Sequence, residues 1–301
     1  MTLSRREVRE LLDRHGLSAS RALGQNFVAD PNTVRRIARL AEIGPGDRVV
    51  EVGAGLGSLT LALAETGAEV TAVEFDRYLL PVLRGVVEPV GVRVVHGDAM
   101  TLDWSALLSD GGRGDAPTHA TLERPPKGRA GPSAVTRAGD ASQWSLVANL
   151  PYNIATPLVL SLLAEVPAIG RMLVMVQREV GERWAAGAGD KAYGIPSVKV
   201  AYWATAEVVG RVPPTVFVPQ PKVESVLVRL RRRPQPPVDV EPDRLFRLVE
   251  AGFGQRRKML RRSLAGLAEP DDFTRAGIRP DARAEELSLA EWARLADATR
   301  T

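Results

Sequence analysis

An apolar segment near the middle of the chain ends in residues that could bind an amine. Residues 144–149, WSLVAN, have the pattern of a buried strand, and Pro151 and Tyr152 follow shortly after. The carboxamide oxygen of Asn149, with a backbone carbonyl that Pro151 frees from regular pairing, offers two acceptors to one exocyclic amine. The ring of Tyr152 offers a stacking face worth about 1–3 kcal/mol for an unpaired base. A capping asparagine and a core tyrosine explain each residue singly, whereas the set predicts an adenine-type amine.

Three glycines and two acidic residues occupy the predicted strand ends before this run. Gly53, Gly55 and Gly57 lie between a strand and a helix, where they let the backbone approach a ligand. Dinucleotide sites, S-adenosylmethionine sites and ordinary tight turns share this spacing. Glu74 ends the next strand, where a carboxylate can bind both ribose hydroxyls of an adenosine. Asp98 ends the third strand and could accept from an adenine amino group, although helix capping is an alternative explanation for either acid.

The elements that must position these residues alternate between strand and helix. Asp30 is a predicted N-cap and Pro31 the first residue of its helix. Strands are then predicted at 48–55, 68–76, 92–99, 144–149 and 171–177, and helices at 56–67, 77–88, 156–166 and 178–187. This alternation predicts an α/β fold, a parallel sheet with helices on both faces, whose ligands bind at the carboxyl ends of the strands. Runs at 206–212 and 225–230 are expected to form a hairpin at the sheet edge.

Two segments interrupt this pattern. Residues 109–142 contain six glycines and four prolines and hardly a large apolar side chain, so we predict a disordered insertion. It leads into the amino end of the strand at 144–149, away from the predicted ligand edge. Residues 231–243 are rich in proline and charge, as in a linker, and residues 244–267 continue as a helical pattern. We therefore expect a catalytic domain at 1–233 and a small all-α domain at 234–301.

The composition excludes several kinds of chemistry. The chain has no cysteine, which excludes disulfides, thiolate metal sites and thiol nucleophiles, and its three histidines are scattered, so no metal site is expected. No apolar run is long enough to span a membrane and the charged start lacks a secretion signal, so a cytoplasmic protein without a membrane partner is expected. Between residues 231 and 264, ten Lys and Arg face four Asp and Glu. This local excess suggests a phosphate-binding surface, although 35 Arg against 5 Lys also fits a GC-rich genome.

The order of these motifs resembles that of the ribosomal RNA adenine N6,N6-dimethyltransferases. The similarity spans about residues 20–265 and is carried by GQNF at 24–27, EVGAGLGSLT at 51–60, GDAM at 97–100, NLPYNIAT at 149–156 and PTVFVPQPKVESVLV at 214–228. FGQRRKMLRRSL at 253–264 is similar to the housekeeping branch, which dimethylates two adjacent adenines near the 3′ end of small-subunit RNA. The insertion and Ala155, where many members carry serine, are departures.

The resemblance implies a Rossmann-like, S-adenosylmethionine-dependent methyltransferase with roles for particular residues. It implies a cofactor pocket lined by Gln25, Asn26, Val28, Gly53, Gly55, Glu74, Asp98 and Asn149. It implies a target-adenine site made by Asn149, Leu150, Pro151 and Tyr152, with Phe217 closing over the base from the other side.

The expected partner is small-subunit ribosomal RNA, within an immature 30S particle, bound by a monomer. We expect one basic helix to grip its phosphates, with Phe253, Leu260 and Leu264 on the apolar face and basic side chains at Arg256, Arg257, Lys258, Arg261 and Arg262. Three alternatives stay open from the sequence: a nicotinamide-dependent oxidoreductase, a large-subunit methylase of the macrolide-resistance type, and a non-catalytic ribosome-assembly factor.

Overall fold

The computed structural model describes residues 2–20, 22–109 and 143–299. Most of the predicted insertion therefore lies outside the described residues. The chain divides into two units, one made of Met1–Arg178 with Val208–Pro234 and the other of Glu179–Glu207 with Gln235–Thr301.

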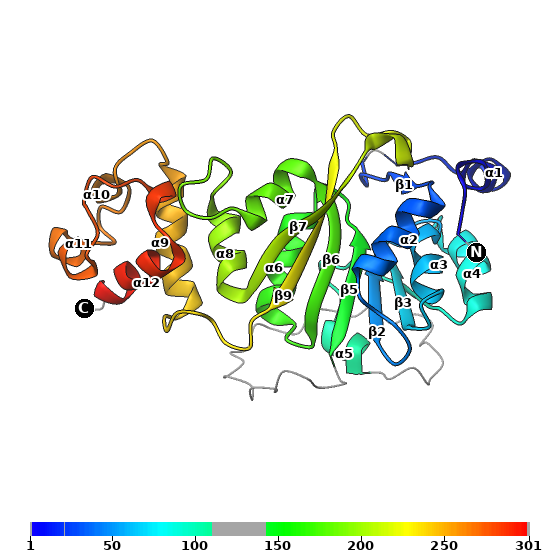
Figure 1. The fold of residues 1–301 in the computed structure, drawn as a ribbon, viewed down its shortest axis with the longest axis horizontal. Helices are drawn as coiled ribbons and strands as arrows, with labels where there is room; N and C mark the ends of the chain where they lie inside the picture. Colours follow the sequence, from blue (N-terminus) through cyan, green and yellow to red (C-terminus); the bar gives the residue numbers. More distant parts are fainter. Residues whose placement is uncertain (1, 21, 110–142, 300–301) are drawn as a thin grey trace. The chain divides into compact units, whose positions relative to one another are not determined.

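A seven-stranded sheet, in the order β4-β3-β2-β5-β6-β9-β7, is the framework of the described chain (Figure 1). Its strands are β2 (Arg48–Val52), β3 (Glu69–Glu74), β4 (Arg93–His96), β5 (Trp144–Asn149), β6 (Ile169–Gln177), β7 (Ala204–Val212) and β9 (Ser225–Arg232). The five strands from β4 to β6 pair in parallel, whereas β9 pairs antiparallel with β6. Parallel strands end at a common edge, so the ends of β2, β3, β4 and β5 come together.

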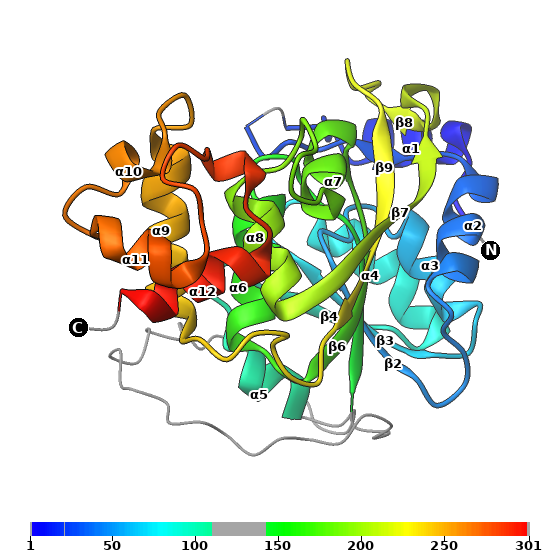
Figure 2. The same cartoon turned by 60° about the vertical axis from the view of Figure 1, so that its left-hand side comes forward.

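The predicted placement of the last two strands at the sheet edge is confirmed. In Figure 2, β7 and β9 run together, and β7 is the outermost strand. A second, two-stranded sheet pairs β1 (Phe27–Val28) with β8 (Phe217–Val218), in the register Phe27 to Val218 and Val28 to Phe217. The pairing of β1 with β8 therefore brings the segment just before α2 next to the segment just before β9.

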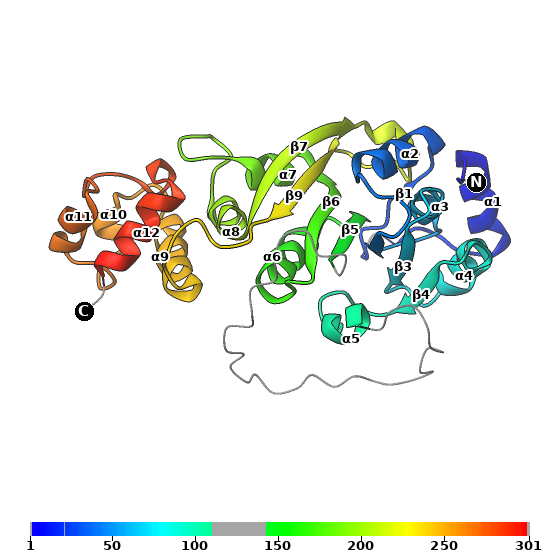
Figure 3. The same ribbon diagram turned by 60° about the horizontal axis from the view of Figure 1, so that its bottom comes forward.

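Helices cover both faces of the sheet, as the alternating sequence predicts. Helices α2 (Pro31–Leu40), α3 (Ser58–Ala64) and α4 (Leu80–Val87) share a buried core with Val49, Ala72 and Val147, which point to one face. On the other face lie α5 (Trp104–Ser109) and α6 (Ala155–Glu165), as Figure 3 shows. Asp30 caps α2 as predicted: its carboxylate accepts from the Thr33 amide at 2.9 Å, and Pro31 is the first helical residue. Helix α1 (Arg5–Arg14) begins with a capping box between Ser4 and Glu7.

The second unit has its own apolar core. Helices α7 (Arg178–Ala185), α8 (Ile195–Trp203), α9 (Pro242–Gly254), α10 (Leu260–Ser263), α11 (Pro270–Ala276) and α12 (Leu289–Ala298) build it. Tyr193, Val198 and Tyr202 pack in one cluster with Leu245 and Trp292. The predicted division at residue 233 was therefore wrong in one respect, because residues 179–207 belong with the C-terminal helices. The proline-rich linker correctly shows where the chain enters this unit for the second time. Which other residues belong to the unit depends on packing, which the linker does not reveal.

The single basic helix predicted around residues 253–264 was also wrong. Helix α9 ends at Gly254, residues 255–258 form turns closed by a 2.7 Å bond from the Lys258 amide to the Gln255 carbonyl, and α10 then begins at Leu260. Leu260 and Leu264 are fully buried as expected. The helical spacing of apolar residues continues across this break, because leucines are buried on both sides of it. The sequence pattern therefore predicted one continuous helix. Within the described residues, no helix has the length and apolar character needed to cross a membrane.

Candidate functional site

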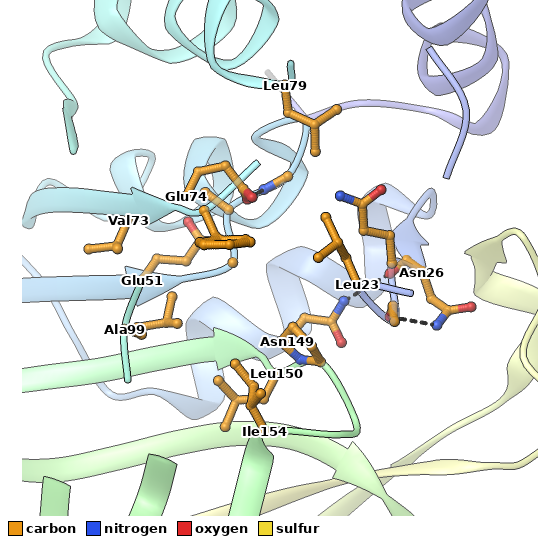
Figure 4. Close-up of a pocket in the computed structure, with 18 of the residues that line it drawn as sticks. Leu23, Asn26, Glu51, Val73, Glu74, Leu79, Ala99, Asn149, Leu150 and Ile154 are labelled. Atoms are coloured by element: carbon orange, nitrogen blue, oxygen red, sulfur yellow. Dashed lines mark hydrogen bonds between the residues drawn. The ribbon is translucent and has the colours of Figure 1, made fainter. Parts of the chain in front are cut away.

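A cavity of about 260 Å³ opens at the edge where β2, β3, β4 and β5 end (Figure 4). Its lining brings together all the predicted cofactor residues, namely Gln25, Asn26, Val28, Gly53, Gly55, Glu74, Asp98 and Asn149. Leu150, Pro151 and Tyr152 line the same cavity. The ends of the parallel strands and the segment at 25–28 therefore bring together the predicted cofactor residues and four of the five predicted adenine-site residues, Asn149, Leu150, Pro151 and Tyr152.

The glycine turn after β2 is required by its conformation and its packing. Gly53 and Gly57 have φ values of 74° and 87°, in the left-handed region that side chains disfavour. A Cβ on Gly57 would lie 2.6 Å from a methyl of Val87, so only glycine allows α3 to begin this close to α4. The turn brings backbone amides and the start of α3 to the cavity, as a nucleotide site needs.

Glu74 is held rigidly at the end of β3. Its carboxylate accepts from the Gly55 amide at 2.7 Å and from the Asp76 amide at 2.8 Å, and the side chain is 5% exposed. Burial raises the pKa of this carboxyl, and hydrogen bonds from the Asp76, Gly55 and Phe75 amides oppose that rise. A carboxylate has about four lone-pair positions, so Glu74 can still accept from a ligand hydroxyl.

Glu51 is a cavity residue that the sequence analysis missed. It lies two residues before Gly53 on β2, is 1% exposed, and has no hydrogen-bond partner for Oε2 within the described chain. Burial raises the pKa of its carboxyl to about 8, and the Glu74 carboxylate acts in the same direction. Ser58, also in the lining, has a buried hydroxyl without a partner among the described residues. The signal was available, because an acid inside an otherwise apolar strand needs a reason to be there.

Two apolar residues beside the predicted acids were missed as well. Phe75 follows Glu74 and Met100 lies two residues after Asp98, and both line the cavity while 53% and 41% exposed. Asp98 itself accepts from the Met100 amide at 2.9 Å, which leaves its second oxygen available. An exposed phenylalanine and methionine at a nucleotide-sized cavity provide apolar faces for a ring.

The orientation of the Asn149 carboxamide follows from its hydrogen bond to the backbone of Asn26. Its Nδ2 donates to the Asn26 carbonyl at 3.0 Å (Figure 4). A carbonyl can only accept, so the nitrogen of the carboxamide must face it and Oδ1 must point elsewhere. The motif at 24–27 therefore leaves the Asn149 oxygen as an acceptor, as the sequence predicted.

The strand pairing also stops where the sequence predicted. The Leu150 amide donates to the Met175 carbonyl at 3.1 Å, but no described residue donates to the Leu150 carbonyl. The Pro151 carbonyl instead accepts from Ile154 and Ala155 as α6 begins. Asn149 Oδ1 and the Leu150 carbonyl are thus two acceptors on adjacent residues of the cavity wall.

The side chain of Gln25 connects its own loop to the segment that follows β3. Gln25 Oε1 accepts from the Ser20 amide at 2.8 Å, and Nε2 donates to Asp76 at 2.8 Å. Both ends of this amide are used within the protein, so Gln25 shapes the cavity wall. Val28 is buried in the wall beside it.

Phe217 differs from the expectation. Its side chain is fully buried, it belongs to the apolar core that includes Val28 and Leu227, and it is not part of the cavity lining. Phe217 is the first residue of β8 and lies opposite Val28 of β1 in that small sheet. In this structure the ring is a core residue and does not close over the base site, because β1–β8 pairing, which motif order does not reveal, fixes its position.

The predicted RNA-binding residues lie in the second unit, at the break between α9 and α10. Arg256 is engaged: it pairs with Glu285 at 3.2 Å and donates to the Lys191 carbonyl at 3.4 Å. The other four are exposed and form no ion pair with any described residue: Arg257, Lys258, Arg261 and Arg262. No group of described acids and histidines could hold a metal ion.

The whole chain was compared with known proteins. Residues 16–300 match the sequence profile of a family described as ribosomal RNA adenine dimethylase. Proteins named ribosomal RNA small subunit methyltransferase A are 45% identical in Cutibacterium acnes, over 97% of this chain and 92% of theirs, and 43% identical in Thermobifida fusca, over 97% and 94%.

Solved structures share the fold. The 23S rRNA methyltransferase ErmE matches with a TM-score of 0.63 and 25% identity, over 92% of this chain and all of its own. A dimethyladenosine transferase from Plasmodium falciparum matches with a TM-score of 0.64 and 21% identity, over 89% and 95%. The order of the motifs, the Rossmann-like sheet and the near-complete sequence match agree: the chain belongs to the ribosomal RNA adenine dimethylase family.

Proposed function

We propose that this protein transfers methyl groups from S-adenosylmethionine to N6 of two adjacent adenines in the 3′-terminal hairpin of small-subunit ribosomal RNA. One observation carries the proposal: Asn149 Oδ1 and the unbonded Leu150 carbonyl are neighbouring acceptors in the wall of a nucleotide-sized cavity. An exocyclic amine has two N–H donors, which these two acceptors match.

The cavity fits S-adenosylmethionine. The buried and unpartnered Glu51 Oε2 and Ser58 Oγ suit a polar, cationic amino-acid portion, and Glu74 suits a ribose. A Cβ on Gly55 would lie 3.0 Å from the Phe27 ring, so the glycine allows that ring to pack against the turn. When bound, the cofactor supplies a methyl group that its sulfonium already activates.

The residues of the site supply geometry. The N6 lone pair of adenine is delocalised into the ring, and two acceptors on its hydrogens favour a pyramidal nitrogen whose lone pair points outward. Holding the reacting atoms in a near-attack arrangement can contribute on the order of 7–11 kcal/mol. The methylated amine is acidic enough to lose its proton afterwards, so no general base is required. In the second round the amine has one N–H, and the site must accept a methyl in place of the other hydrogen.

The exposed basic residues of the second unit suit RNA phosphates. Arg257, Lys258, Arg261 and Arg262 are free to bind phosphate, whereas Arg256 fastens the turn that carries them. Replacing Arg257 and Arg261 with alanine is expected to reduce the salt dependence of RNA binding by about two released ions. Arg279→Ala, which removes an arginine paired with Glu286, is the matched control. An unchanged salt slope in the double variant would refute this assignment.

The small-subunit target is favoured over the large-subunit one. Relatives named for the small subunit reach 45% identity, whereas the 23S methyltransferase ErmE is 25% identical. The protein would act as a monomer in the cytoplasm on immature 30S particles, with a role in their biogenesis. If cells carrying Asn149→Ala lose the methylation but assemble small subunits normally, the two roles are separable.

The test is methylation with labelled S-adenosylmethionine. Undermethylated 30S particles, 50S particles and naked ribosomal RNA are supplied separately, and the modified adenines are mapped. We expect label in small-subunit RNA at two adjacent adenines, with N6,N6-dimethyladenine as the product. Label only in 50S particles would overturn the proposal.

A further inference from the structure

We propose that Ser225 is a positioning residue for the reaction, and that it acts by fixing the ring of Tyr152 through a hydroxyl–hydroxyl hydrogen bond. The inference rests on the proposed function, because Tyr152 is expected to stack on the target adenine. Ser225 lies 73 residues further along the chain, and it neither lines the cavity nor belongs to the predicted site.

The bond is short and enclosed. Tyr152 Oη and Ser225 Oγ are 3.0 Å apart, and either atom can donate. Ser225 is fully buried, whereas Tyr152 is partly exposed at the cavity. The phenol hydroxyl is thus tied inside the protein while the ring remains at the wall. Tyr152 therefore presents a ring face to a base, and its hydroxyl is not free to contact the amine.

Ser225 itself is well fixed. It begins β9 opposite Gln177, the last residue of β6, in the antiparallel register of the sheet. Arg178 follows Gln177 in the chain, and Glu224 precedes Ser225. The Arg178 amide donates to the Glu224 carbonyl at 3.0 Å, and the side chains of Arg178 and Glu224 form a 2.7 Å ion pair. The end of the β6–β9 ladder is therefore clamped at the point where the Ser225 hydroxyl meets Tyr152.

This arrangement links the stacking face to the acceptors. β6 pairs with β5, and the Leu150 amide bonds to Met175 on β6. The acceptors of the amine and the tether of the ring are thus both anchored to one strand, β6. A ring that keeps a constant angle to Asn149 Oδ1 can hold a base in the plane in which its amine meets both acceptors. Without the tether the ring can tilt, and fewer bound adenines are aligned for transfer.

The experiment is a double-mutant cycle on methylation of undermethylated 30S particles. Tyr152→Phe keeps the ring and removes the hydroxyl, and Ser225→Ala removes the partner. We expect each to lower kcat about three- to tenfold, the value of one hydrogen bond, with KM for S-adenosylmethionine unchanged. The double variant should be no slower than either single one. Multiplying effects would overturn the proposal.

A matched control separates positioning from general stability. Ser145 is a buried strand serine whose hydroxyl accepts from Arg171 Nε at 2.6 Å, at the opposite end of β5. Ser145→Ala is expected to lower the melting temperature as Ser225→Ala does, but its effect should multiply with that of Tyr152→Phe. If Ser225→Ala behaves like this control, its role is structural and the proposal fails.

A spectroscopic measurement does not depend on activity. In protein labelled with 13Cζ-tyrosine, the Tyr152 signal is assigned by its loss in Tyr152→Phe. We expect Ser225→Ala to shift that signal and Ser145→Ala to leave it in place. An unmoved signal in Ser225→Ala refutes the hydrogen bond even if no ribosomal RNA is methylated, so the failure of this inference and that of the proposed function can be told apart.

Discussion

Replacing Glu51 with glutamine should make the folded protein more stable at alkaline pH. The carboxyl of Glu51 is 1% exposed on β2, and burial raises its pKa from 4.5 to about 8. The folded protein therefore keeps a proton between these values that the unfolded chain has released. A folded state that binds more protons than the unfolded state loses stability as pH rises, so stability falls through this window. Glutamine has nearly the same shape and carries no charge at any pH.

The size of the effect follows from the shift in pKa. A pKa that moves from 4.5 to about 8 corresponds to about 5 kcal/mol of unfolding free energy, at 1.36 kcal/mol per tenfold change in proton affinity. At pH 5 the glutamic acid is protonated in the folded protein and little of this cost is present. At pH 9 the whole cost is present. The stability advantage of Glu51→Gln should therefore grow by about 4 kcal/mol between these limits, because the unfolded chain has already released part of its proton at pH 5.

The assay is urea unfolding of the ligand-free protein, followed by circular dichroism at pH 5, 6, 7, 8 and 9. Glu69→Gln serves as the control, because that side chain is exposed at the start of the neighbouring strand β3. Its difference from the wild type should change little with pH. A difference between Glu51→Gln and the wild type that stays constant from pH 5 to pH 9 would show that the carboxyl does not hold a proton when buried. Glu51 would then not have a raised pKa in the folded protein.

Three other substitutions test further parts of the structure. Asn149→Ala should lower methylation about 100-fold or more while cofactor binding by calorimetry is weakened far less, because it removes an acceptor that acts on the reacting amine; equal losses in both would contradict that role. Gly57→Ala should cost about 1–3 kcal/mol in urea unfolding, because the new methyl would lie 2.6 Å from Val87 at a φ of 87°; wild-type stability would contradict the packing. Arg232→Met should cost about 2–4 kcal/mol, because the partly buried guanidinium makes four hydrogen bonds to carbonyls at and beyond the end of α6; thermal melting with Arg231→Met, an exposed arginine of the same strand, as the control tests this, and equal melting temperatures would refute it.

The sequence alone determined the order of strands and helices and most of the cofactor site. Apolar runs of strand length alternating with helical patterns can bury their side chains only as a sheet covered on both faces. Gly53, Glu74, Asp98 and Asn149 each end or follow a strand, and parallel strands all end at the same edge. These two facts place the four residues at one edge of the sheet, so this part of the cavity lining was predictable from the sequence.

Only the tertiary structure decided how those residues are used. The sequence does not reveal that the Asn26 carbonyl turns the Asn149 oxygen outward, or that the hydroxyl of Tyr152 is bound by Ser225. It also gave no sign that Phe217 would pair opposite Val28 and be buried in the apolar core. These facts depend on contacts between segments far apart in the chain, and a local pattern carries no information about which distant partner satisfies a polar group or covers a ring.

The same reason explains the two corrections. Residues 179–207 have the local pattern of the sheet domain, yet Tyr193 and Val198 pack in the core of the C-terminal helices. The break between α9 and α10 has no proline to mark it. Leucines are buried on both sides of the break. Only the folded core shows that these leucines can be buried with a turn between them as well as in one continuous helix. Local sequence determined which elements form, whereas long-range packing decided where they end and what they join.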